Sequence, residues 1–306
     1  MKSSNEKQER MGQSMRVFIA GATGVLGRSL IPQLLESGQS VRALARSPER
    51  TGGLKSEKDL IEIVTGDLLA PGMEQRLPEM MEGCDAVMHI ATAIPRNPSA
   101  PGAWDANTRL RTEGTRRLLD AALAAHVTYY FQQSIVMAYI NGGDAWQDEN
   151  TPLDTSPARM AVTGPVISME AMVRAVPVEQ MPWCILRGGL FVGPGTGQAE
   201  TVARIREGKM VVPCDGSNYV SLVNVADMAR AFALALTNAM PGTTFNIVAE
   251  PLRNGEYLDH IAALLHVPAP PRDPAQPCPP SHRCSNEAAR EFLGWTPLHS
   301  IYEGIG

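Results

Sequence analysis

The chain has 306 residues, 44% of them apolar, which is enough for one large domain or for a main domain with a smaller one. Its net charge of −5 argues against the basic face that nucleic-acid binding needs, and no run of about 18 apolar residues could span a membrane. The five cysteines are scattered and odd in number, as expected of reduced thiols in a cytoplasmic protein.

The first segment, residues 1–14, is polar and lacks the apolar core of a secretory signal, so we expect a flexible extension. Residues 17–20 form a short apolar run that predicts a buried strand, and 25–37 predict an amphipathic helix. The turn between them carries glycines at 21, 24 and 27. Glycine permits the sharp turn and lets a diphosphate approach the free N–H groups of the helix. This pattern predicts a dinucleotide site.

Strands and helices then alternate through the first two-thirds of the chain. Further strands are predicted at 40–45, 60–65, 85–90, 127–134 and 183–187, and helices at 104–125 and 166–176. Such alternation predicts an α/β fold, a doubly wound parallel sheet with helices on both faces. Ligands of such sheets bind at the carboxyl ends of the strands.

After about residue 188 glycine and proline cluster, and the elements become shorter. Residues 223–235 begin as a strand and turn into a helix, and the proline-rich segment 268–280 predicts an extended connector. We therefore expect a main domain over 15–187 and a smaller C-terminal α/β cap over 188–306, interleaved with the main domain around 220–250. The sparse spacing of Cys278, His282 and Cys284 does not predict a metal site.

Seven motifs in order resemble the extended short-chain dehydrogenase/reductase family, in its epimerase/dehydratase branch, over nearly the whole chain. They are GATGVLG at 21–27, GDL at 66–68, HIATA at 89–93, RTEGTRRLLDAA at 111–122, LRGGLFVGPG at 186–195, VNVAD at 223–227, and Asn286 followed by FLGWTP at 292–297. The resemblance implies a Rossmann fold, a nicotinamide dinucleotide and a possible homodimer.

The resemblance also implies which residues touch the cofactor. The diphosphate is expected against the glycine turn, the adenine beside Asp67 and Leu68, and the nicotinamide ribose beside 91–93. The implied cofactor-binding residues are Gly21, Ala22, Thr23, Gly24, Val25, Leu26, Asp67, Leu68, Ala91, Thr92 and Ala93.

The end of the second strand bears on the choice of cofactor. NAD sites carry a carboxylate about 20 residues past the glycines to bind the ribose 2′-hydroxyl. Here Ala45, Arg46 and Ser47 offer none, and a guanidinium matches a 2′-phosphate. We therefore expect Arg46 to bind the cofactor, which favours NADP(H) over NAD(H).

Catalysis in the family usually needs Tyr-x-x-x-Lys on the helix after the fifth strand, and a Ser or Thr at the end of that strand. Aligning the end of this helix puts Val162 at the tyrosine position and Val166 at the lysine position, and residues 140–182 contain neither Tyr nor Lys. The tyrosine of the motif moves a proton to or from the substrate oxygen, helped by the lysine cation. Both proton-handling residues are therefore absent.

Three interpretations follow. Ser134 and Tyr139, near the end of the fifth strand, are the candidate catalytic residues, although each could instead be structural. Hydride delivery to a conjugated or iminium-like carbon could also proceed with water or a substrate group as the proton source. Alternatively, the chain could bind NADP(H) without turnover, as a sensor or a partner-binding protein.

We predict an atypical NADP(H)-dependent oxidoreductase of the cytoplasm that acts on a small, fairly apolar organic molecule and binds neither nucleic acid nor membrane. A nucleotide-sugar epimerase or dehydratase is a further alternative, which would need Arg204, Arg206 or Lys209 of the cap to bind the substrate diphosphate. His89, Arg187, Asn224 and Asp227 are expected to have structural roles.

Overall fold

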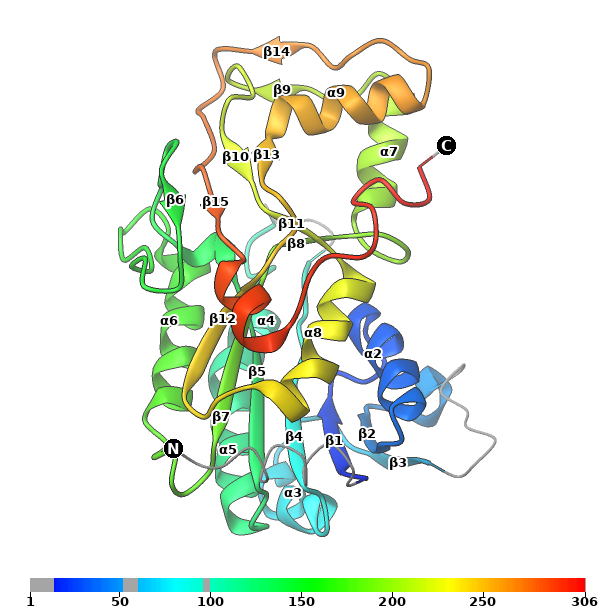
Figure 1. Cartoon of the computed structure of the whole chain (residues 1–306), viewed down its shortest axis with the longest axis vertical. Helices are drawn as coiled ribbons and strands as arrows, with labels where there is room; N and C mark the ends of the chain where they lie inside the picture. The colour runs from blue at the N-terminus through cyan, green and yellow to red at the C-terminus, as the bar shows by residue number, and fades with distance from the viewer. Residues whose placement is uncertain (1–13, 52–59, 96–99, 306) are drawn as a thin grey trace.

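The computed structural model describes residues 14–51, 60–95 and 100–305, so residues 1–13 of the expected extension lie outside the described residues. Its centre is a seven-stranded sheet in which all neighbouring strands are parallel (Figure 1). In spatial order the strands are β12 (Thr243–Ile247), β7 (Trp183–Gly188), β5 (Tyr129–Ile135), β4 (Ala86–His89), β1 (Arg16–Ala20), β2 (Ser40–Ala45) and β3 (Ile61–Thr65). The predicted doubly wound parallel sheet is confirmed, and its order reverses between β1 and β4, where ligands of such folds bind.

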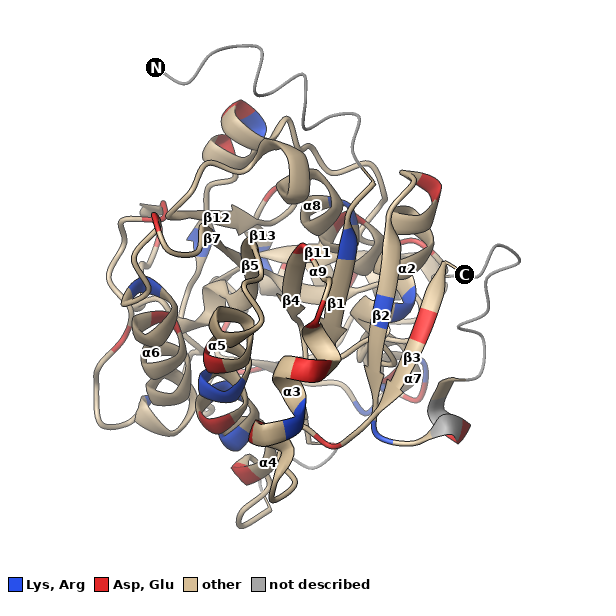
Figure 2. Ribbon diagram, turned by 90° about the horizontal axis from the view of Figure 1, so that it is seen from below, with Lys and Arg blue, Asp and Glu red and all other residues tan. Residues whose placement is uncertain are grey.

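Apolar runs form the central strands because helices cover both faces of the sheet (Figure 2). Residues 17–20 of β1 are at most 1% exposed. One core layer joins the sheet to α2 (Val25–Glu36) and α8 (Val225–Asn238). The other joins it to α3 (Met73–Met81), α5 (Thr115–Ala124) and α6 (Met160–Arg174).

The predicted helix over 104–125 is divided in three. It begins as α4 (Asp105–Arg109), widens into the π-helical η2 (Leu110–Gly114), and continues as α5. A π-helical turn holds an extra residue compared with an α-turn, so it rotates the side chains that follow. The helix predicted over 166–176 corresponds to α6, which starts six residues earlier and continues through Pro165.

Above the sheet lies a smaller part that we call the cap. It consists of α7 (Gln198–Arg206), α9 (Asn254–Leu264) and two strand pairs, β9 (Val212–Pro213) with β14 (Arg272–Asp273) and β10 (Tyr219–Val220) with β13 (Leu252–Arg253). The cap has its own apolar cluster around Val212, Leu258 and Ile261. Between the cap and the main sheet, β8 (Leu190–Val192) pairs with β11 (Leu222–Asn224), and β6 (Trp146–Gln147) pairs with β15 (Arg283–Cys284). The remaining short helices are η1 (Pro48–Thr51), η3 (Val136–Ala138) and η4 (Ala289–Leu293).

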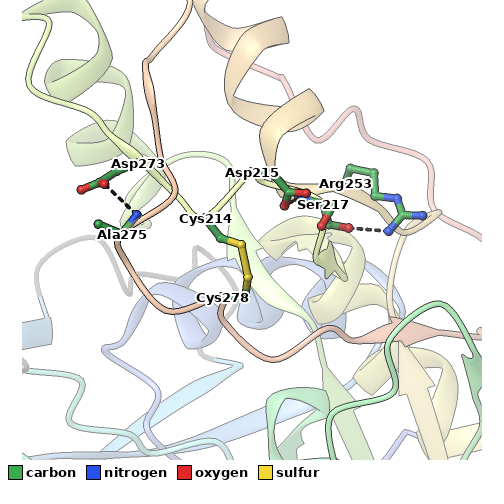
Figure 3. The surroundings of a disulfide bond; sticks show 7 residues. All are labelled: Cys214, Asp215, Ser217, Arg253, Asp273, Ala275 and Cys278. Atoms are coloured by element: carbon green, nitrogen blue, oxygen red, sulfur yellow. Dashed lines mark hydrogen bonds between the residues drawn. A yellow bond between two sulfur atoms is a disulfide. The ribbon is translucent and has the colours of Figure 1, made fainter.

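Two of the cysteines are joined, which corrects the expectation that all five are reduced. Cys214 directly follows β9, Cys278 lies in the segment after the paired strand β14, and their Cα atoms are 5.0 Å apart in a disulfide (Figure 3). Sequence spacing could not indicate this pair because 64 positions separate its members. Cys214, Asp215 and Cys278 also bring three possible metal-ligand atoms together, but the two sulfurs are bonded to each other in the disulfide.

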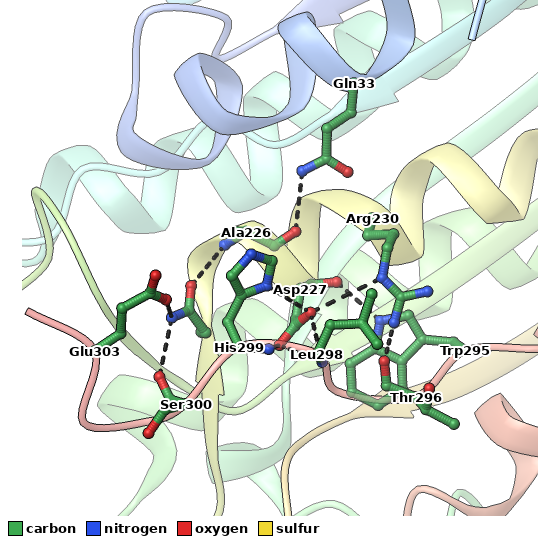
Figure 4. Close-up of polar contacts among 11 residues, drawn as sticks. Gln33, Ala226, Asp227, Arg230, Trp295, Thr296, Leu298, His299, Ser300 and Glu303 are labelled. Carbon is green, nitrogen blue, oxygen red and sulfur yellow. Dashed lines mark hydrogen bonds and ion pairs between the residues drawn. The ribbon is translucent and has the colours of Figure 1, made fainter. Parts of the chain in front are cut away.

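The end of the chain is fixed to α8 by the carboxylate of Asp227, which is fully buried (Figure 4). This carboxylate accepts hydrogen bonds from the backbone N–H groups of Leu298 and His299 and lies 3.0 Å from His299 Nδ1. Asn224 caps α8 by accepting from the Ala226 N–H and donates to the Ser300 carbonyl. The predicted structural roles of Asn224 and Asp227 are confirmed. None of the described helices is long and apolar enough to cross a membrane.

Candidate functional site

A cavity of about 1040 Å³ lies between the carboxyl ends of the central strands and the cap. Its floor comes from the ends of β1, β2, β4 and β5, and Gln198 and Tyr257 of the cap contribute to its wall. The cavity therefore lies where a doubly wound fold places its ligand.

The glycine turn shapes one end of this cavity. Gly21 has a φ of 104°, and a Cβ there would lie 2.6 Å from the Ala91 nitrogen, so no other residue fits between β1 and β4. Gly27 packs against the backbone of Ala22 just as closely. Gly24, by contrast, is exposed and caps α2 without a side chain, which leaves the first N–H groups of the helix open to the cavity. Such N–H groups bind phosphate.

The predicted cofactor-binding residues lie together, with one exception. Ala22 is fully buried and packs in the core, so its side chain does not reach the cavity. The others all line the cavity: Gly21, Thr23, Gly24, Val25, Leu26, Arg46, Asp67, Leu68, Ala91, Thr92 and Ala93.

The residues that bear on the choice of cofactor line the cavity just after β2 and β3. Arg46 is exposed at the end of β2. Asp67 Oδ1 accepts from the Leu69 N–H at 3.0 Å, whereas Oδ2 has no hydrogen bond to any described residue. A carboxylate with one free oxygen and a guanidinium thus face the same end of the cavity.

The two positions assigned to the missing dyad lie on α6, beside the cavity. Val162 lines the wall and Val166 is fully buried behind it. Their side chains cannot exchange protons, so these two positions offer apolar contact only.

Ser134 and Tyr139 do not face the cavity, which corrects the expectation that they reach the cleft. Both are fully buried, and neither lines the cavity. Ser134 Oγ donates to Glu170 Oε1 at 2.6 Å, and Tyr139 donates to Asn246 Oδ1 at 2.8 Å. Side chains alternate along a strand, so Gln133 and Ile135 line the cavity while Ser134 between them points to the other face.

The two hydroxyls belong to a buried polar network centred on Arg187. Its guanidinium donates to both oxygens of Glu170 and, at 2.7 Å, to the Tyr139 hydroxyl. Burial, the largest single influence, would raise the pKa of Glu170, but the hydrogen bonds and charge of Arg187, together with Ser134 and Arg174, lower it. Burial raises the pKa of Tyr139 well above that of a free phenol, which makes it a poor proton donor. This network connects β5, β7 and α6 and confirms the structural role of Arg187.

His89 is also structural, as predicted. Its Nε2 lies 3.2 Å from the Leu110 carbonyl oxygen, and burial lowers its pKa to about 4, so the ring is neutral at physiological pH.

Several polar side chains that line the cavity were missed by the sequence analysis, among them Arg111, Gln133 and Arg159. The alternation of β5 could have indicated Gln133 once its register was fixed. The arginines have no comparable signal, because arginines on helices are usually solvated. Arg159 Nη2 donates to the Met137 carbonyl at 2.7 Å, and its Nε lies 3.8 Å from Asp154.

A family model, described as the NAD dependent epimerase/dehydratase family, matches residues 17–248. The 3-diazoavenalumate denitrifying reductase of Streptomyces sp is 30% identical over 95% of this chain and 99% of its own length. The 2-alkyl-3-oxoalkanoate reductase of Stenotrophomonas maltophilia is 26% identical over 95% of this chain and 97% of its own length.

Solved structures share the architecture. The dTDP-glucose 4,6-dehydratase of Streptomyces venezuelae, with NAD and TYD bound, superposes with a TM-score of 0.78 at 21% identity. The match covers 95% of this chain and 94% of that chain. At this identity the likeness shows a common fold.

Proposed function

We propose that this chain, which belongs to the NAD dependent epimerase/dehydratase family, is an NADPH-dependent reductase that delivers hydride to an electrophilic carbon of a small, largely apolar molecule. The observation that carries the proposal is the wall of the cavity. Val162 and Val166 stand where the family's proton-handling pair is expected, and the nearby hydroxyls of Ser134 and Tyr139 are turned away from it.

The described residues fit a nicotinamide dinucleotide. The open N–H groups at the start of α2 suit the diphosphate, Asp67 Oδ2 has no hydrogen bond to a described residue and suits the adenine amine, and 91–93 suit the nicotinamide ribose. Arg46, whose neighbours in the sequence are Ala45 and Ser47 rather than a carboxylate, favours a 2′-phosphate. When bound, the dihydronicotinamide supplies the hydride.

A substrate whose leaving group is dinitrogen needs no proton from the protein. The Streptomyces relative is named for a diazo compound and for denitrification, so an aromatic diazo compound is our first candidate substrate. In its diazonium form the ring carbon gains one hydride, the C–N bond breaks, and its electron pair leaves with N2. The charges balance without any acid. Residues such as Val162, Ile135 and Phe191 would hold the ring and exclude water.

The alternatives find less support. The cavity is open rather than filled by side chains, which disfavours a protein that only binds partners. The cap cations needed for a nucleotide-sugar diphosphate, Arg204, Arg206 and Lys209, are exposed and do not line the cavity.

The test is enzyme-dependent transfer of a labelled hydride. The purified protein would be given NADPH deuterated at C4 and 4-carboxybenzenediazonium, with protein-free and NADH reactions as controls. The proposal expects benzoic acid carrying deuterium at the former C–N carbon, formed faster with NADPH than with NADH. NADPH binding without enzyme-dependent oxidation, with this probe and with conjugated enones, would leave a non-catalytic binding protein instead.

We also propose that the enzyme works in the cytoplasm. The test is where the protein is recovered when its source cells are fractionated, and we expect it in the cytoplasmic fraction. Recovery from an oxidising compartment, where disulfides such as Cys214–Cys278 are common, would overturn this proposal.

A further inference from the structure

Arg111 is a buried cation that lines the cavity and forms no ion pair with any described residue. It lies in η2, is only 4% exposed, and lines the cavity. Among the described residues its one hydrogen-bond partner is the sulfur of Met169, 3.7 Å from Nη1. A thioether is a weak acceptor, so most of the guanidinium's hydrogen-bonding capacity is unused.

The carboxylate that acts on Arg111 at a distance is already occupied. This carboxylate is Glu170, whose charge favours the ionised form of Arg111. Its two oxygens accept from Ser134, Arg174 and the fork of Arg187. Burial lowers the pKa of Arg111 to about 10, which still leaves it charged at neutral pH. A buried charge without a partner is costly, and a bound anion removes that cost.

Gln133 of β5 also lines the cavity and is 8% exposed. Its side-chain amide has no hydrogen bond to any described residue. A guanidinium whose one described partner is a thioether and an amide with no described partner thus both line the cavity.

The charged groups of the cofactor have other places. The diphosphate belongs at the start of α2 and the 2′-phosphate at Arg46, whereas the carboxamide and ribose at the nicotinamide end are neutral. The charge of Arg111 is therefore left to bind a charged group of the substrate. Since a carboxylate meets the guanidinium fork with two parallel hydrogen bonds, a substrate acid fits the site.

We propose that Arg111 binds a carboxylate of the substrate, so that the enzyme takes an apolar, aromatic acid rather than a neutral molecule. This inference rests on the proposed function, because it assigns the cofactor and the substrate to the two ends of one cavity. Arg111 would act as a binding and specificity residue: the fork fixes one end of the acid, and the apolar wall at Val162 and Phe191 receives its ring.

The test compares cinnamate and benzoate with their uncharged amides, by isothermal titration of the protein saturated with NADP⁺. Wild-type protein should bind an acid at least about tenfold more tightly than its amide, the discrimination expected when a charged hydrogen bond is lost. Arg111→Met should abolish this preference and leave the affinity for NADP⁺ unchanged. Arg111→Lys, which keeps the charge and loses the fork, should retain part of the preference and serves if the methionine variant does not fold. Arg116→Met, an exposed arginine of α5 outside the cavity, is the matched control.

Several results would overturn the inference. One is equal binding of acids and amides by the wild-type protein, or binding of neither acid. Another is an acid preference that survives in Arg111→Met. A third is that Arg111→Met weakens the binding of NADP⁺ instead of the binding of acids, which would assign the guanidinium to the cofactor. Failure of the wild-type protein to bind NADP(H) would instead reject the proposed function, and the acid preference can be measured separately without cofactor.

Discussion

The side chains of Glu170 and Arg187 form a forked ion pair, with Nε–Oε1 at 2.9 Å and Nη2–Oε2 at 2.6 Å, and both residues are at most 3% exposed. The pair joins α6 to β7 behind the cavity wall. Ser134 and Tyr139 are hydrogen-bonded to it, so residues that look catalytic in the sequence hold the wall in place.

Breaking this ion pair should destabilise the protein strongly. Glu170→Gln leaves Arg187 charged and buried with an incomplete partner, and we expect a loss of about 3–5 kcal/mol in the free energy of unfolding, measured by urea denaturation. The double variant Glu170→Leu/Arg187→Met should lose less than the sum of the single changes, since it removes both charges. A change within about 0.5 kcal/mol for Glu170→Gln would show that the pair contributes little.

Ser134→Ala and Tyr139→Phe should change stability rather than turnover. Each removes a hydrogen bond to a charged group, at a cost of about 1.5–3 kcal/mol, while the NADPH affinity and the rate of NADPH oxidation stay near wild-type. Gln133 is the neighbour of Ser134 on the opposite face of β5, and Gln133→Ala should change turnover rather than stability. A large fall in kcat for Tyr139→Phe in folded protein would return the phenol to the reaction.

Arg46→Ala should lower the discrimination between the two cofactors. Losing one charged interaction with the 2′-phosphate should raise the Kd for NADPH by about 10- to 100-fold and leave the Kd for NADH unchanged, as followed by nicotinamide fluorescence. Arg204→Ala, an exposed arginine outside the cavity, is the control. Equal weakening of both cofactors would mean that Arg46 does not read the 2′-phosphate.

His89 should make the protein less stable in mild acid. Its pKa is about 4 in the fold and near 6.5 when free, so the unfolded chain binds a proton that the folded chain does not. The free energy of unfolding should therefore fall by about 1.4 kcal/mol per pH unit between pH 6.5 and pH 4 on this account, with a further contribution from His282 in the same direction. His89→Gln should flatten the dependence, and an unchanged slope would exclude His89 as its cause.

Reduction of the Cys214–Cys278 disulfide should lower stability, since it closes a long loop of the unfolded chain. The loop-entropy relation gives about 4 kcal/mol for this separation. Thermal unfolding with and without dithiothreitol measures the effect, and Cys214→Ser should remove the response to reductant whereas Cys284→Ser should not. A wild-type midpoint that is unaffected by complete reduction would show that the cap is held by its other contacts.

The sequence predicts those parts of the molecule that local chemistry determines. The glycine turn and the apolar strands are local patterns, and the structure places them as expected. The direction of the Ser134 side chain was predicted wrongly because a shift of one residue in register exchanges the two faces of a strand. The partners of Arg111 and the pairing of Cys214 with Cys278 depend on segments far apart in the chain, which no local pattern reports.

The order of the chain limits how the two parts of the molecule can be separated. It leaves the main sheet after β7, returns through α8 and β12, enters the cap again at β13 and α9, and ends back against α8 through Trp295 and His299. No contiguous deletion therefore removes the cap and leaves an intact dinucleotide domain. Exchange of caps between relatives would need several coordinated junctions, so new substrates are more accessible through single side chains in the cavity wall than through recombination of whole segments.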